Sequence, residues 1–254
     1  MQTILYIIFF IIGAIMGSFF HATATRLAKE ESIIKPSSHC HYCNHKLKWY
    51  ELIPIISFII QKGRCTSCKK KLPISYIIIE IATGILYSIS YHAFGLGSEL
   101  TIALSFISIL IINIISDIEY MIILDEVLLF GICLIIILYF FLFDFHTCAY
   151  HIIDGIIAFF IMYAIKIIGD LVFKRESMGG GDIKLMYLFG LVLGYKLSIV
   201  TIFLATFIAF PIAIVILISR KNNLIPFGPF LSMAAILILI SKVNINEIIG
   251  FLIS

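Results

Sequence analysis

The stretch KRESMGGGDIKLMYLFG, residues 174–190, decides the fold, because it ends one long apolar run and begins another. Two basic residues close the first run, three glycines follow, and Asp182 precedes the apolar residues that resume. The whole chain is 61% hydrophobic and only 13% charged, with a mean hydropathy of +1.12. A soluble globular chain is usually about half apolar and about a quarter charged. The sequence therefore predicts an all-α polytopic membrane protein.

A membrane-spanning helix needs about 20 mostly apolar residues, and eight stretches fit this pattern, although seven or nine spans remain compatible with it. The first stretch has no Lys or Arg before it and is long for a signal-peptide core, so we interpret it as an uncleaved span. The sixth is short and contains Gly190 and Gly194, which leaves its limits the least defined. The eight predicted spans are 3–24, 74–95, 99–118, 124–143, 151–173, 183–195, 197–219 and 229–251.

The basic residues gather on one predicted face. Ten of the 18 lysines and arginines lie within residues 26–71. Others flank the glycine stretch or follow the seventh span: Lys174, Arg175, Lys184, Arg220 and Lys221. The loops on the opposite face, near 96–98 and 144–150, have none. Positive charge marks the cytoplasmic side, so this face should be cytoplasmic and both termini should lie outside. This assignment of basic residues to one face does not account for the positions of Lys166, Lys196 and Lys242.

The segment 25–73 is the largest soluble part, and at about 50 residues it is too small to fold on a core alone. It contains CHYC at Cys40 and Cys43, and CTSC at Cys65 and Cys68, with 21 residues between the pairs. Two CxxC turns at this spacing are typical of a closed, structural Zn(Cys)4 site, and a reducing cytoplasm argues against disulfides. Four ordinary thiols, or a site with a histidine ligand from His39, His41 or His45, are the alternatives. We therefore expect three parts: a first transmembrane helix at 1–24, a cytoplasmic zinc-binding domain at 25–73, and a seven-helix membrane domain at 74–254.

Two carboxylates stand out at one predicted membrane edge. Asp117 lies at the cytoplasmic end of the third span, in INIISDIEYMIILDE (112–126), and Asp182 lies at the cytoplasmic start of the sixth. Ionisable residues at membrane depth are functional candidates. Two carboxylates in contact would share a proton, so that one acts as base toward a water and the other as acid toward a peptide carbonyl.

The glycines 179–181 have no side chains to block a peptide backbone, and they could adopt conformations that other residues avoid. The alternative is a plain helix N-terminus, with Asp182 capping it. Asp125 could cap the fourth span. Glu80 could pair with a basic residue of the zinc domain, and Asp170 with Lys166.

Five motifs, in order, resemble the prepilin peptidase (type IV leader peptidase) family of GxGD-type aspartic proteases. GSFFHATATRLA (17–28) is similar to the family's GSFLNVVIxRLP, and the double CxxC matches its cytoplasmic domain. DIEYMIILDE (117–126) is similar to D-x-x-x-x-x-I-P-D. GGGDIKL (179–185) matches G-x-G-D-x-K-L, and IPFGPFLSMAAI (225–236) matches the IPFGPFL run.

The resemblance implies a multi-pass enzyme of the bacterial cytoplasmic membrane. It would cleave the basic leader of type IV prepilins or pseudopilins after a glycine on the cytoplasmic side, with the lipid bilayer and these substrates as its partners and no nucleic acid. It would also methylate the new N-terminal residue with S-adenosylmethionine. Carried over residue by residue, Asp117 and Asp182 are catalytic, and Cys40, Cys43, Cys65 and Cys68 bind zinc. A substrate loop would comprise Gly179, Gly180, Gly181 and Lys184.

Gly17, Ser18, Arg26 and Glu80 also match family positions and could support methyl transfer. The chain departs from the family at three places: His21 stands where Asn is usual, and Ala28 and Leu124 stand where Pro is usual. Two of these departures lie in the region that the resemblance ties to methylation.

Two other classes of function compete with this one. A membrane scaffold that docks a partner through its zinc domain would need the cysteines but not Asp182. A transporter would use Asp117, Glu80 and Asp170 as an ion path, and would place charges near the bilayer midplane. Asp117 and Asp182 lie at the edge instead, and the internal repeats common among transporters are not seen.

Overall fold

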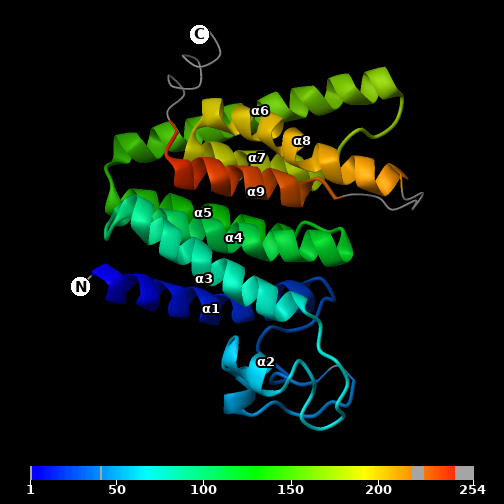
Figure 1. Cartoon of the computed structure of the whole chain (residues 1–254). Coiled ribbons are helices and arrows are strands. Elements are labelled where there is room, and N and C mark those ends of the chain that lie inside the picture. Colours follow the sequence, from blue (N-terminus) through cyan, green and yellow to red (C-terminus); the bar gives the residue numbers. More distant parts are fainter. Residues whose placement is uncertain (1, 41, 219–225, 244–254) are drawn as a thin grey trace. The chain divides into compact units, whose positions relative to one another are not determined.

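The computed structural model describes residues 2–40, 42–218 and 226–243, and every regular element in these ranges is a helix (Figure 1). The predicted basic pair Arg220 and Lys221 and the end of the eighth predicted span lie outside the described residues. The chain divides into two compact units, Met1–Gly95 and Leu96–Ser254. The elements are α1 Gln2–Leu27, η1 Trp49–Leu52, α2 Ile56–Ile60, α3 Ser75–Phe94, α4 Ser98–Tyr120, α5 Asp125–Leu142, α6 Phe145–Phe173, α7 Gly180–Leu193, α8 Tyr195–Ile218 and α9 Gly228–Ser241.

Six of the described helices are long and apolar enough to cross a membrane: α1, α3, α4, α5, α6 and α8. This confirms an all-helical, multi-pass membrane protein. α7 and α9 have 14 residues each in the described part of the chain. At about 1.5 Å per residue each is roughly 21 Å long, shorter than the ~30 Å hydrocarbon core. Each of the eight predicted stretches therefore overlaps a described helix, while eight complete membrane spans remain a prediction.

The first unit is built on the close packing of α1 against α3 (Figure 1). A Cβ atom at Gly13 would lie 2.8 Å from the Cα atom of Gly84, and one at Gly17 would lie 2.9 Å from the Thr83 hydroxyl. Small residues spaced by four let two helix backbones approach in this way, as in transmembrane helix pairs. The glycines of the first predicted span therefore serve helix packing.

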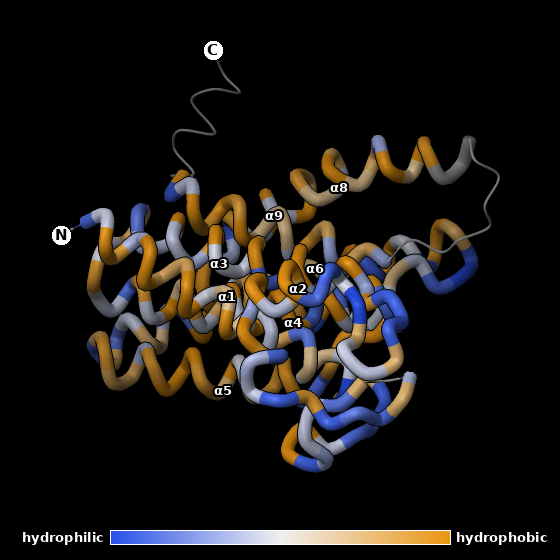
Figure 2. The backbone as a smooth tube through the Cα atoms, turned by 60° about the horizontal axis from the view of Figure 1, so that its bottom comes forward, coloured by the Kyte–Doolittle hydropathy of each residue, from blue (hydrophilic) through white to orange (hydrophobic). Residues whose placement is uncertain are grey.

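The chain between α1 and α3 is mostly hydrophilic, in contrast to the orange helices of Figure 2. It forms two turns of the same design. An antiparallel bridge joins His39 to Lys46 around the first CxxC, and another joins Arg64 to Lys71 around the second. Asn44 and Lys69, each directly after a second cysteine, both have positive φ, 55° and 58°.

The second unit is a helical bundle with α7 inside it. α7 packs against α5, α6, α8 and α9, and five of its apolar side chains are fully buried: Leu185, Met186, Leu188, Phe189 and Leu191. Gly190 permits a close crossing, since a Cβ there would lie 2.7 Å from Ala158 of α6. α7 ends at Gly194, whose φ is +82°.

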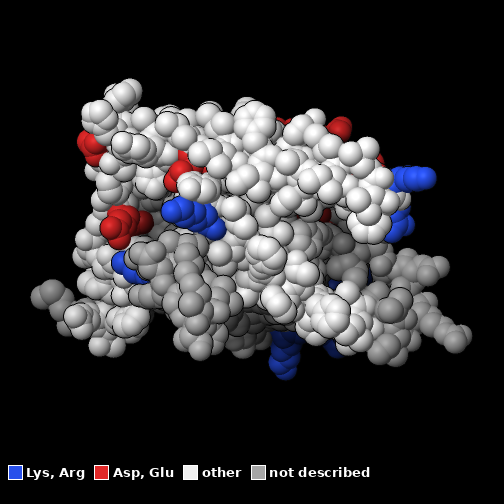
Figure 3. Space-filling model, turned by 90° about the horizontal axis from the view of Figure 1, so that it is seen from above, with Lys and Arg blue, Asp and Glu red and all other residues white. Residues whose placement is uncertain are grey.

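The outside of the second unit is apolar. On α8, the side chains of Phe203, Phe207 and Phe210 follow a helical spacing and are all exposed. The view in Figure 3 is mostly free of charged side chains, with a few scattered over it. Such a surface is unfavourable in water and suits contact with lipid chains.

Candidate active site and metal centre

Asp117 lies in the last turn of α4, where the helix ends. Met121 closes the helix in a left-handed conformation, φ 57°, and its N–H donates to the backbone carbonyl of Asp117 at 3.0 Å. The carboxylate is only 6% exposed and accepts a hydrogen bond from the backbone N–H of Gly228. The sequence placed Asp117 at a helix end, and the structure adds that its carboxylate faces the protein interior.

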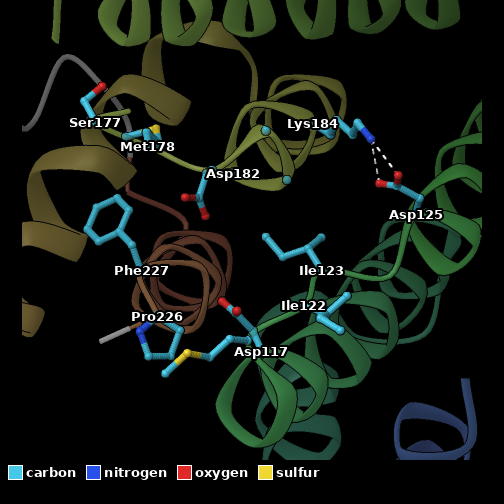
Figure 4. Close-up of a pocket in the computed structure, with 14 residues that line it drawn as sticks. Asp117, Ile122, Ile123, Asp125, Ser177, Met178, Asp182, Lys184, Pro226 and Phe227 are labelled. Atoms are coloured by element: carbon cyan, nitrogen blue, oxygen red, sulfur yellow. Dashed lines mark hydrogen bonds and ion pairs between the residues drawn. The ribbon is translucent and has the colours of Figure 1, made fainter. Parts of the chain in front are cut away.

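Asp182 lies in the first turn of α7 and is 7% exposed. Its carboxylate accepts a hydrogen bond from the backbone N–H of Gly179, the residue that precedes the helix. The alternative interpretation of this stretch, a helix N-terminus with Asp182 capping it, therefore describes the local geometry correctly. Capping accounts for one side of the carboxylate only, because the other side faces Asp117 (Figure 4).

The two carboxylates meet at Gly228, the first residue of α9. A Cβ atom at Gly228 would overlap Oδ2 of Asp117 and would lie 3.4 Å from Oδ1 of Asp182. Both carboxylates therefore lie beside the start of α9, and Figure 4 shows the side chains of Asp117 and Asp182 pointing toward each other. Sequence analysis placed Gly228 in a family motif but gave it no role, because nothing local shows that α9 begins between two carboxylates from other helices.

A pocket of about 810 Å³ opens over this pair. Its lining comes from the α4–α5 connection, the glycine stretch and the residues before α9, including Ile122, Ile123, Met178, Pro226 and Phe227. Among the described residues, two charged side chains line it besides Asp117 and Asp182. Lys184 of α7 bonds to both carboxylate oxygens of Asp125 of α5 at 2.7 Å. The predicted substrate-loop lysine is thus part of an ion pair, and Asp125 has this role besides starting α5.

The three glycines have different surroundings. A Cβ atom at Gly181 would come within 2.8 Å of Ile123, whereas one at Gly180 would meet nothing within 4 Å. None of the three has a positive φ, so the expectation that they use conformations closed to other residues is wrong. Gly181 is needed for close approach to the α4–α5 connection, and Gly179 and Gly180 leave the pocket wall open.

Asn113 supports the site and was missed by sequence reasoning. It is buried one turn before Asp117, and its Oδ1 accepts a hydrogen bond from the backbone N–H of Leu124 at 3.1 Å. The family usually has Pro at position 124, and a proline has no N–H to donate. This bond is therefore available because the chain departs from the family pattern there. A lone Asn in an apolar helix, four residues before a key Asp, was the available signal.

Comparison with known proteins gives matches along most of the chain. Residues 11–94 match the bacterial peptidase A24 N-terminal domain, and residues 104–214 match the type IV leader peptidase family. A prepilin leader peptidase/N-methyltransferase of Bacillus subtilis is 35% identical over 242 residues, 91% of this chain and 92% of the relative. The chain belongs to the type IV leader peptidase family.

More distant relatives with the same name come from Vibrio cholerae and Myxococcus xanthus. The first is 27% identical and covers 95% of this chain and 98% of the relative. The second is 29% identical and covers 74% of this chain and 56% of the relative. No solved structure matches the chain.

The two CxxC turns of this leader peptidase family member bring together four cysteines that could hold a metal ion. The four Sγ atoms of Cys40, Cys43, Cys65 and Cys68 all lie within 4.8 Å of one another. Sγ of Cys40 is 3.9 Å from that of Cys68, and Sγ of Cys43 is 3.9 Å from that of Cys65. Zn–S bonds of about 2.3 Å in a tetrahedron put the sulfurs roughly 3.8 Å apart, so the four thiols fit zinc.

The surroundings of these cysteines favour a metal over the alternatives. The backbone N–H of Cys68 lowers the pKa of the Cys65 thiol to about 6, while the pKa of the Cys68 thiol is raised to about 11, so the cluster favours a thiolate at Cys65 first. The described histidines have other partners: His39 Nδ1 lies 3.0 Å from the Ser37 carbonyl, and His45 Nε2 lies 3.4 Å from Glu51. His41 lies outside the described residues.

The residues that match family positions in the first unit have structural contacts. Arg26 donates to the backbone carbonyl of Ile33 at 2.8 Å, and Gly17 packs against α3. Glu80 is buried, hydrogen-bonded to the Ser18 side chain, and accepts a bond from the backbone N–H of Ile55 at 2.6 Å. The expected partner of Glu80 was a basic side chain, but its partner in the zinc segment is this N–H group.

Contacts also show the partner of Asp170 and the surroundings of His21. Asp170 bonds to the backbone N–H of Ser177 at 2.7 Å and to its hydroxyl at 2.8 Å, so its main partner is Ser177 and not Lys166. His21, which replaces the usual Asn, is buried, and its ring lies 4.2 Å from that of Tyr76. Each contact ties neighbouring parts of one unit together.

Proposed function

We propose that this chain is an aspartic endopeptidase that removes the basic leader from type IV prepilins or pseudopilins. One observation carries the proposal: buried Asp117 and Asp182 converge on Gly228 below an 810 Å³ pocket. Membership of the leader peptidase family supports the substrate class. Neither a scaffold nor a transporter needs two carboxylates that meet below an open pocket.

The geometry suits water-mediated hydrolysis. Because the side chains of Asp117 and Asp182 both line the pocket and face each other, a single water between them could contact both carboxylates. One carboxylate would take a proton from the water as its oxygen attacks the scissile carbonyl carbon, while the other would give a proton to the carbonyl oxygen. When the C–N bond breaks, the amine of the mature pilin would leave with a proton and the leader would keep the new carboxyl group.

The predicted topology fits this reaction. With eight spans, the basic residues, the zinc segment and the glycine stretch would all face the cytoplasm, and both termini would lie outside. The leader of a prepilin would then reach Asp117 and Asp182 from the cytoplasmic side, while its apolar helix stays in the bilayer. Zinc would hold the segment between α1 and α3 in its folded form and take no part in hydrolysis, because all four positions are filled by cysteines.

The names of the relatives also support N-methylation with S-adenosylmethionine as a second activity. Gly17, Ser18, Arg26 and Glu80 have contacts within the protein that account for them, so we assign none of them to cofactor binding. The methyltransferase activity therefore rests on the relatives alone, and we derive no step for it.

The proposal is tested by expressing the full chain with a type IV prepilin and measuring the intact mass of the pilin. Loss of the leader is expected with the wild-type chain and not with Asp117→Asn or Asp182→Asn. Glu126→Gln is the matched control, because Glu126 is an exposed carboxylate in the first turn of α5 and does not line the pocket. Cleavage by either Asn variant would refute the two-aspartate mechanism, and an added methyl group on the product would establish the second activity.

A further inference from the structure

The part of the zinc segment from Trp49 to Ile60, here called the η1–α2 segment, exposes large apolar side chains. Trp49 is 78% exposed, Ile60 75%, Ile59 62% and Ile56 55%. The three isoleucines are spaced i, i+3 and i+4, so they share one face of α2. Tyr50 and Leu52 are exposed as well. A contiguous apolar surface of this kind marks a site of interaction.

The depth of this segment is fixed by a contact with a membrane-spanning helix. Glu80 in the second turn of α3 accepts a hydrogen bond from the backbone N–H of Ile55, the residue that precedes α2. Glu80 is five residues beyond the start of α3 at Ser75, which is about 8 Å along the helix. The polar layer on each side of the hydrocarbon core is only about 5–8 Å thick. α2 therefore begins beside the membrane span, and its isoleucines cannot be far out in the cytoplasm.

The direction in which the chain enters α2 is also fixed. Ile55 has a φ of +62°, a conformation that β-branched residues rarely adopt. The Glu80 hydrogen bond is made by this same residue, so the unusual turn and the contact with α3 occur together. The isoleucine face is thus held in place relative to α3 by the fold.

The charges around the segment match an anionic surface. Exposed Lys48 stands directly before it, and exposed Lys62 stands two residues after it. Its only carboxylate, Glu51, is buried and bonds to the backbone N–H of Lys48 and the hydroxyl of Thr66. A tryptophan, a run of isoleucines and flanking lysines form the pattern of a segment that lies in a membrane interface.

We propose that the η1–α2 segment is an interfacial membrane anchor, with Trp49 and the isoleucine face of α2 inserted at the boundary of headgroups and acyl chains. Lys48 and Lys62 contact anionic headgroups. The anchor holds the zinc segment against the bilayer. This inference does not depend on the peptidase activity.

The test uses the one tryptophan of the chain, because Trp49 fluorescence reports directly on this segment in the full-length protein. The zinc-loaded protein is reconstituted in phosphatidylcholine vesicles that contain phosphatidylglycerol and lipids brominated at a shallow or a deep acyl position. Blue-shifted emission is expected, with more loss of emission from shallow than from deep bromines and little loss from aqueous acrylamide. Quenching by acrylamide and not by bromolipids would place Trp49 in water and refute the anchor. Shielding from both quenchers would mean that protein covers the segment, which also refutes it.

Variants separate insertion from folding. The double change Ile59→Ser and Ile60→Ser should shift Trp49 emission to the red and increase its quenching by acrylamide. Ile34→Ser is the matched control, since Ile34 is an 84% exposed isoleucine of the same unit outside the segment, and should change neither signal. Lys48→Gln with Lys62→Gln should remove any dependence of bromolipid quenching on phosphatidylglycerol. Zinc content checks that each variant is folded, and an unchanged spectrum in a zinc-loaded Ile59→Ser, Ile60→Ser variant would overturn the proposal.

Discussion

Gly228 lies so close to Asp117 that a Cβ atom at Gly228 would overlap the carboxylate oxygen. The same atom would be in ordinary contact with Asp182 at 3.4 Å, so a methyl group at this position would displace Asp117 from its place beside Asp182. Gly228→Ala should therefore lower kcat/KM for leader cleavage by about 100-fold, the effect of a shift near 1 Å in reacting groups. Cleavage of a purified prepilin in detergent measures this.

The control for Gly228→Ala is Gly97→Ala. Gly97 precedes α4 in an extended conformation, and a Cβ there would meet nothing within 4 Å. This variant should cleave like the wild type. Unchanged cleavage by Gly228→Ala would show that the carboxylates tolerate a side chain at this point, against the geometry described above.

Gly181 and Gly180 offer a comparison of two neighbouring glycines. A methyl group at Gly181 would press on Ile123, whereas at Gly180 it would enter open space. Overpacking of this kind costs about 1–3 kcal/mol, so Gly181→Ala should lower the thermal midpoint of unfolding. Gly180→Ala should leave it close to that of the wild type. Equal midpoints for the two variants would mean that the α4–α5 connection yields to the added methyl group.

The Lys184–Asp125 ion pair predicts opposite effects of two substitutions on substrate binding. The pair is neutral in total, and both side chains are about half exposed or more. Lys184→Gln leaves a free carboxylate on the pocket wall and should lower KM for a basic leader, while Asp125→Asn leaves a free ammonium and should raise it. A partly exposed charge is worth up to about 1 kcal/mol, so each change should be at most about fivefold.

The test for Lys184 and Asp125 is a measurement of KM at low and high salt. Screening should shrink both effects at high salt. A change of KM in the same direction for the two variants would show that the pair acts through the shape of the pocket and not through its charge.

We expect the four cysteines to bind one zinc ion per chain. Zinc binding should depend equally on each of the four. Each CxxC turn has its own antiparallel bridge and its own positive-φ residue after the second cysteine, so we expect both turns to contribute equally to the site. Cys40→Ser and Cys65→Ser should both lose bound zinc and expose residues 28–74 to proteolysis. Cys133→Ser, which changes an exposed cysteine of α5 outside the cluster, should keep the metal. Metal analysis after gel filtration measures this, and full zinc in either of the first two variants would argue against a four-cysteine site.

Sequence patterns predicted the parts of the site that follow from local chemistry. Runs of apolar residues predicted the helices. The ends of those runs predicted that Asp117 and Asp182 lie at helix ends. The CxxC spacing predicted a cluster that the structure brings together. These features depend on residues that are close in sequence, or on the common membrane edge at which the predicted spans begin and end.

The missed features depend on contacts between distant residues. Gly228 is a positioning residue only because the start of α9 lies between α4 and α7. Asn113 matters because it reaches Leu124, and Glu80 reaches a backbone N–H instead of the expected cation. Every residue except proline has a backbone N–H, so residue types do not indicate which backbone group will donate to a carboxylate. Sequence reasoning therefore looks for a basic side chain as the partner of a buried carboxylate and misses a backbone donor.

α7 is shorter than α5, α6 and α8, against which it packs. Most of its apolar side chains are buried among these helices and α9, away from lipid. At roughly 21 Å against a ~30 Å hydrocarbon core, it leaves part of the depth of the membrane without helix. The pocket over Asp117 and Asp182 lies at the N-terminal end of α7, where the helix begins. The bilayer need not thin to let water in. The protein itself would carry a small aqueous recess below the membrane surface, and a substrate helix could stay at its normal depth while its end is hydrolysed.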